Sequence, residues 1–268
     1  MLLNENLRLL LFSSNFLILF LLFAMLFMVE IGWRIGAHLS SKYGAKKVDA
    51  SETFLAAIFG LLALLIAFTF SGAFERFDNR RELIALEVSA TGTAYQYVDL
   101  LATKDQQKVR ELFSDYLDSR INLYQGNHTL SEMHLEKKVA AHNAIGSQLW
   151  KAVVLIVENT AYPQKAVTAQ ILPKVSDMFT ASENQRLASK FHPPEIIWKA
   201  LLILSFIGSL VAGYNMGIEK KRDWLVVIIF SILMAGTIFI IFSLEYPRIG
   251  KVSLVDFEAE LMILRKSF

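Results

Sequence analysis

Hydrophobic residues fall into four long blocks along the chain, separated by polar stretches. The block at residues 54–73 carries no charged side chain, and its length is what a helix needs to cross the hydrocarbon core of a bilayer. Comparable blocks occupy residues 9–29, 196–216 and 224–242. The block at residues 9–29 is longer than the apolar core of a signal peptide and precedes no small-residue cleavage site, which predicts a permanent anchor. The pattern predicts an all-α integral membrane protein with four transmembrane helices.

The second hydrophobic block continues directly into charged sequence. No proline and no turn signal separates it from the charges that begin at Glu75. One helix is therefore expected to leave the membrane and to continue in water to about Leu101, and Gly92 is a candidate interruption of that helix.

The central region is also predicted to be helical. Apolar residues recur at helical spacing over residues 109–124, and further helices are expected at residues 131–158 and 163–191, the second of them bent or broken at Pro173. The expected domains are transmembrane helices 1 and 2 (1–74), a helical extra-membrane domain (75–192), transmembrane helices 3 and 4 (193–246) and an amphipathic tail (247–268).

Small residues recur every four positions in two of the hydrophobic blocks. Ala63, Ala67 and Ser71 share one face of the second block, and Gly213 and Gly217 share one face of the third. Small side chains let the backbones of two membrane helices approach closely. These faces are therefore predicted to pack against other helices.

Composition excludes several classes of function. Hydrophobic residues make up 54% of the chain and charged residues 19%, and the net charge of +2 is too small to indicate a nucleic-acid partner. There is no cysteine, so disulfides and thiolate metal sites are excluded. The sequence has no phosphate-binding glycine loop, no nucleophile elbow and no zinc-protease motif, and its five histidines are scattered. We expect no enzyme, no catalytic residue, no metal and no cofactor.

Three arginines follow the second block just past the expected membrane boundary. Arg76, Arg80 and Arg81 would attract anions if an oligomer arranged them as a ring. They would equally serve to anchor the helix at phospholipid headgroups while pairing with the acidic residues between them. Their spacing leaves both interpretations open.

Three stretches carry a resemblance to a known family. Residues 60–83, GLLALLIAFTFSGAFERFDNRREL, resemble the signature of the bacterial bestrophin-like domain family. Residues 87–95, EVSATGTAY, are similar to its E-A-N-A-I-G-T-A-Y motif, from which Val88 and Ser89 depart. Residues 246–252, YPRIGKV, are similar to its C-terminal motif, whose acidic residue is either displaced here or replaced by Glu245.

The second block is also similar to the pore helix of bestrophin anion channels. The similarity places Leu64 and Phe68 where those channels have bulky apolar residues in the pore neck. The third neck position falls on Gly60, which has no side chain with which to form a ring. The resemblance implies a homo-oligomeric ion channel, with a pentamer and anion selectivity favoured, and a helical domain in the cytoplasm.

The leading hypothesis is a multi-pass channel of the inner membrane, whose partners are the lipid bilayer, further copies of itself and small inorganic ions. Leu64 and Phe68 would form a hydrophobic neck, Gly60 and Ser71 would line the pathway, and the arginines would bias its mouth. The alternative is a membrane-anchored sensor or scaffold that conducts nothing. Orientation also stays open, because the positive charges of the short loops alone would place the helical domain outside the cytoplasm.

Overall fold

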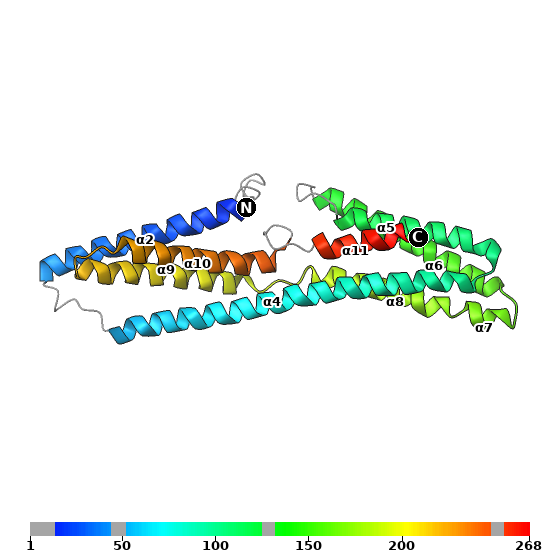
Figure 1. Cartoon of the computed structure of the whole chain (residues 1–268), viewed down its shortest axis with the longest axis horizontal. Coiled ribbons are helices and arrows are strands. Elements are labelled where there is room, and N and C mark those ends of the chain that lie inside the picture. Colours follow the sequence, from blue (N-terminus) through cyan, green and yellow to red (C-terminus); the bar gives the residue numbers. More distant parts are fainter. Residues whose placement is uncertain (1–13, 44–51, 125–131, 248–254) are drawn as a thin grey trace. The chain divides into compact units, whose positions relative to one another are not determined.

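The computed structural model describes residues 14–43, 52–124, 132–247 and 255–268, and these residues form helices joined by short connections (Figure 1). The predicted all-α membrane fold is confirmed, because four helices are long and apolar enough to cross a bilayer. In chain order the elements are α2 (Ser14–Tyr43), α4 (Glu52–Gln96), the 3-10 helix η1 (Tyr97–Leu100), α5 (Thr103–Tyr124), α6 (Glu132–Asn159), α7 (Gln164–Thr168), α8 (Ile171–Ala188), α9 (Glu195–Ile218), α10 (Trp224–Glu245) and α11 (Val255–Lys266).

The chain forms two compact units. The membrane unit comprises Met1–Phe77 and His192–Val252, and the helical unit comprises Asp78–Phe191 and Ser253–Phe268. Helix α4 begins in the first unit and ends in the second.

Three helix boundaries differ from the sequence prediction. Helix α2 continues to Tyr43, well past the end of the predicted span at residue 29, and residues 9–13 of that span lie outside the described residues. Helix α4 passes through Gly92 without a break, since a single glycine costs a helix only about 1 kcal/mol. The helix predicted over residues 163–191 breaks between α7 and α8, a few residues before Pro173. Pro173 therefore lies in the first turn of α8, where its missing N–H loses no helical hydrogen bond.

The membrane unit is built on a direct contact between the backbones of α2 and α9. Gly32 and Gly36 on α2 face the backbone of α9, and Gly213 and Gly217 on α9 face the backbone of α2; we call these four residues the glycine seam. A β-carbon added at Gly213 would lie 2.0 Å from the carbonyl oxygen of Val29. Only glycine fits this spacing, as in other small-residue contacts of membrane helices. Helix α10 packs on the same α2.

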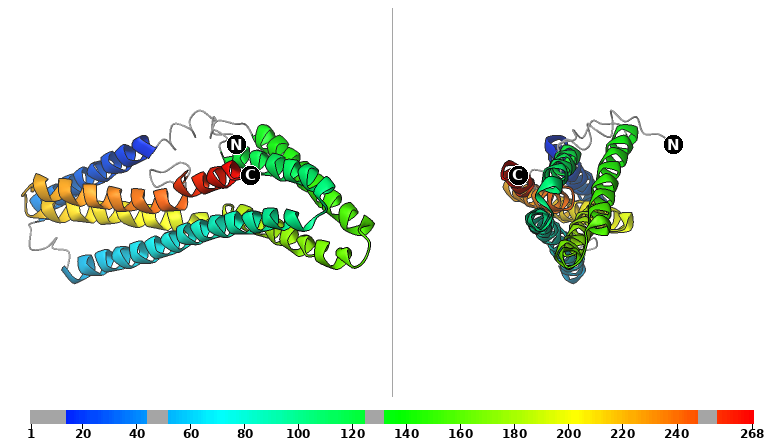
Figure 2. Two further views of the ribbon diagram at one scale, coloured as in Figure 1. Left: turned by 45° about the vertical axis from the view of Figure 1, so that its right-hand side comes forward. Right: turned by 90° about the vertical axis from the view of Figure 1, so that its right-hand side faces the viewer.

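The helical unit has a side-chain core instead. Helix α5 lies beside both α6 and α11 (Figure 2). The core buries one face of each long helix, as the apolar spacing over residues 109–124 predicts for α5. Its buried members are Ala94, Val98, Leu101, Val109, Phe113, Tyr116, Leu149, Val153, Val157, Ile171, Val175 and Met178.

The tail helix α11 docks on this core through specific contacts. Arg265 donates from Nε and Nη2 to the carboxylate of Asp118 at 2.7 and 2.9 Å. The Tyr95 hydroxyl donates to the carbonyl oxygen of Phe268 at 3.1 Å, and the two rings stack with centroids 3.7 Å apart. The tail is therefore an integral part of the helical unit.

Candidate functional site

One face of α4 in the membrane unit stays uncovered by the rest of the chain. Gly60, Leu64, Phe68 and Ser71 are all exposed, and their spacing of three and four residues places them on one side of the helix. We call these four residues the exposed α4 face. The Phe68 side chain is 68% exposed. Only 11% of the apolar stretch of α4 is buried within the chain, against 39% for α10, so this surface must meet lipid or another polypeptide.

The opposite side of α4 contacts its own unit. The Phe59 ring meets the Phe230 ring of α10 edge to face, with centroids 5.8 Å apart. Gly208 of α9 makes room for Phe59 and Leu62, whose side chains lie within 3.5 Å of the position that a β-carbon there would take. These contacts orient the exposed α4 face away from α9 and α10.

The small residues predicted to pack helices have different surroundings. Gly213 and Gly217 lie in the glycine seam against α2. Ala63 and Ala67 are exposed beside the exposed α4 face. Gly32 and Gly36, the α2 half of the seam, were missed, although their spacing of four residues in GWRIG was a readable signal.

A buried carboxylate ties α4 to the end of α10. Glu245 is fully buried, and its Oε2 accepts hydrogen bonds at 2.8 Å from Nε of Arg76 and lies 2.8 Å from Nη2. Its Oε1 lies 3.0 Å from Nδ1 of His192, whose ring stacks on Tyr246. A buried charge persists when it is paired and hydrogen-bonded in this way. We call Arg76, His192 and Glu245 the Glu245 cluster.

The other two arginines also have partners within the chain. Arg80 is 3% exposed and donates from Nε and Nη2 to the carbonyl oxygens of Ala188 and Phe191, at 3.3 and 3.0 Å. Arg81 donates from Nη1 to Asp78 Oδ1 at 3.1 Å. Arg80 therefore stabilises the carbonyl end of α8 rather than facing solvent.

An acidic residue shares the exposed α4 face. Glu75 is exposed and follows Phe68 by seven residues and Ser71 by four, which is two turns and one turn of helix. An exposed carboxylate therefore follows the exposed α4 face one turn after Ser71, before the first of the three arginines.

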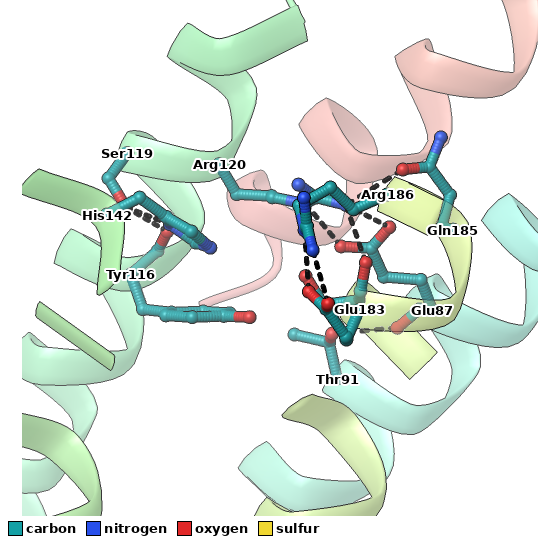
Figure 3. Close-up of polar contacts among 10 residues, drawn as sticks. Glu87, Thr91, Tyr116, Ser119, Arg120, His142, Glu183, Gln185 and Arg186 are labelled. Atoms are coloured by element: carbon teal, nitrogen blue, oxygen red, sulfur yellow. Dashed lines mark hydrogen bonds and ion pairs between the residues drawn. The ribbon is translucent and has the colours of Figure 1, made fainter. Parts of the chain in front are cut away.

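In the helical unit, a buried ion pair joins three helices (Figure 3). Arg120 of α5 donates from Nε to Glu87 Oε1 of α4 at 2.5 Å, and from Nη2 to Oε2 at 3.0 Å. The same Nη2 lies 3.0 Å from Gln185 Oε1 and 3.2 Å from the Ser182 carbonyl oxygen, both on α8. Glu87 opens the second stretch that carries the family resemblance, so that stretch has an internal structural role.

Two neutral groups lie beside this pair. Burial and the charge of Arg120 lower the pKa of His142 to about 4, and its Nδ1 lies 2.7 Å from the Ser119 hydroxyl. Burial raises the pKa of Tyr116 to about 12. His142 is thus uncharged and Tyr116 protonated at neutral pH. Within the described ranges, no three His, Asp or Glu residues are grouped in a way that would hold a metal ion.

Comparisons with known proteins match most of this chain. The model of the Bestrophin-like domain family matches residues 20–256. A crystal structure of a mutated bacterial bestrophin homologue from Klebsiella pneumoniae matches with a TM-score of 0.66 at 14% identity, covering 93% of this chain and 96% of that one. A second structure of a Klebsiella pneumoniae homologue gives a TM-score of 0.62 at 14% identity, covering 91% and 98%. No curated protein matches the chain.

Proposed function

Because the chain belongs to the Bestrophin-like domain family, we propose that it forms a homo-oligomeric ion channel whose pathway is lined by the exposed α4 face. The observation that carries the proposal is the exposure of Leu64 and Phe68 on a helix that continues from the membrane unit into charged sequence. A channel gives such a face a function, because copies arranged around an axis would turn it towards a common pathway. The bestrophin resemblance favours a pentamer.

The neck is formed by bulky apolar side chains. Rings of Leu64 and Phe68 would narrow the pathway and exclude water from it, so the channel would close by dewetting. Gly60 has no side chain to project into the pathway, so the pathway would be wider there than at the neck. Ser71 lies three residues after Phe68 and would offer a hydroxyl to hydrated ions.

The proposed location is the inner membrane, with the helical unit in the cytoplasm. This orientation follows the family resemblance over the charges of the short loops. The substrates are small inorganic ions, and lipid covers the remaining apolar surface of α2, α9 and α10.

The test is the current carried by purified protein in a planar bilayer under asymmetric KCl. We expect discrete openings from the natural protein. Phe68→Ala should raise the open probability or the unitary conductance, because it removes the largest apolar group of the neck. The matched control is Phe23→Ala on α2, where the phenylalanine is 64% exposed but lies off the exposed α4 face.

Two outcomes would contradict the proposal. If Phe68→Ala and Phe23→Ala gave the same currents as the natural protein, the assigned neck would be wrong. A silent bilayer from folded, oligomeric protein would instead favour the membrane-anchored sensor or scaffold.

A further inference from the structure

The Glu245 cluster contains Arg76, whose positive charge the sequence places at the mouth of the proposed pathway. Arg76 follows Phe68 by eight residues and Ser71 by five on α4. At 1.5 Å per residue, Arg76 lies about 12 Å along the helix axis from Phe68. An isolated positive charge at that distance would be felt by a permeating ion, because screening inside a protein is weak.

The structure shows that this charge is cancelled. Glu245 is fully buried, and one of its oxygens takes both contacts from Arg76 while the other meets His192. The cancellation depends on folding, since Arg76 and Glu245 are 169 positions apart in the chain.

We propose that Glu245 is a selectivity-determining residue of the channel. By neutralising Arg76, it keeps positive charge away from the pathway beyond the neck and so lowers anion permeability relative to cation permeability. This inference rests on the proposed channel function. Glu245 acts through Arg76 and need not touch the permeating ion.

The test is the reversal potential of reconstituted protein in asymmetric KCl. Glu245→Gln keeps the shape of the side chain and one acceptor oxygen for Arg76 but leaves Arg76 with an uncancelled charge. Coulomb's law at an effective dielectric constant of about 20 and a distance of about 10 Å gives roughly a tenfold change for each ion, favourable for chloride and unfavourable for potassium, and so at least about a hundredfold increase in chloride over potassium permeability. The reversal potential should move towards the chloride equilibrium potential accordingly.

Two further variants separate charge from structure. Arg76→Gln should lower the ratio of chloride to potassium permeability, because it leaves the carboxylate uncompensated. The double variant Arg76→Gln/Glu245→Gln removes both charges and should return the ratio to that of the natural protein. A purely structural role for Glu245 would reduce stability but would leave the reversal potential where it was.

The matched control is Glu30→Gln. Glu30 also pairs with arginines, at 2.8 Å from Arg34 and 3.3 Å from Arg222, but it lies near the start of α10 rather than its end. That helix has 22 residues, so the two carboxylates are about 30 Å apart. We expect no change in reversal potential from this substitution.

The outcomes of the experiment are distinct. A conducting Glu245→Gln channel with the natural reversal potential would overturn the inference. If Glu245→Gln fails to fold, equal reversal potentials in Arg76→Gln and the double variant would overturn it as well. Absence of current from the natural protein would overturn the proposed function itself.

Discussion

Each of the two units is stabilised internally by a different kind of contact. The helical unit buries large side chains from η1, α5, α6 and α8, and it adds a buried ion pair between Glu87 and Arg120. The membrane unit brings the backbones of α2 and α9 into contact at glycines. The difference follows from the solvent. Removing an apolar side chain from water is favourable, but removing it from lipid gains nothing, so membrane helices must gain contact by close approach.

The same comparison explains why α4 is uncovered in the membrane unit. An apolar helix surface that would be costly in water is stable against lipid or against a second copy. Within the helical unit the same helix is buried at Glu87 and Ala94, because water makes burial favourable there.

The strongest test of this comparison is the buried ion pair of the helical unit. Arg120→Ala would leave Glu87 buried without its guanidinium, which should cost about 3–5 kcal/mol in the free energy of unfolding. Thermal unfolding of the detergent-solubilised protein, followed by circular dichroism, measures the loss. The matched control is Arg110→Ala, which removes a partly exposed pair with Asp99 and should cost about 1 kcal/mol or less. Equal losses would show that burial does not set the value of the pair.

A second test uses the buried His142 of the helical unit. Its pKa is lowered to about 4 from 6.5. Between these two values the unfolded chain binds a proton that the folded chain does not. The free energy of unfolding should therefore fall as the pH falls from 6.5 to 4, by up to about 3 kcal/mol, and should not fall further below pH 4 on account of this group. The measurement is the unfolding midpoint against pH.

The variant His142→Gln isolates this contribution. It removes the titrating group, so the part of the acid destabilisation due to His142 should disappear between pH 6.5 and 4. Identical pH profiles for the natural protein and the variant would contradict the assignment.

A third test probes the glycine seam of the membrane unit. Gly213→Ala places a methyl group 2.0 Å from the Val29 carbonyl oxygen, and separating the helices should cost about 1–3 kcal/mol. Gly236→Ala on α10 is the matched control, since a β-carbon there meets no atom within 4 Å. That control should be neutral or stabilising by up to about 1 kcal/mol, because alanine favours helix. If both substitutions had the same effect on the unfolding midpoint, backbone contact would not be what holds α2 to α9.

Much of the fold could be predicted from the sequence because the hydrophobic blocks are long. A run of about twenty uncharged residues has few alternatives to a membrane helix. The common face of Leu64 and Phe68 also followed from spacing alone, since a helix fixes the side on which residues four apart lie.

The partners of the arginines could not be predicted in the same way. Whether Arg80 faces water or the end of α8 depends on where a helix more than a hundred residues later ends. The pairing of Arg76 with Glu245 likewise depends on how α10 returns beside α4. Arg76 and Glu245 both lie in or beside stretches that resemble the family, but the resemblance does not show that they are in contact.

The glycine seam has a consequence for how the sequence can change. At Gly32, Gly36, Gly213 and Gly217, any β-carbon would lie within 2.3 Å of a backbone oxygen on the facing helix. No single replacement relieves such an overlap, because the group that would have to move is main chain rather than side chain. A library of random variants selected for folded protein should therefore return glycine at these four positions. The exposed α4 face should meanwhile accept many residues, limited by what the ions passing it require.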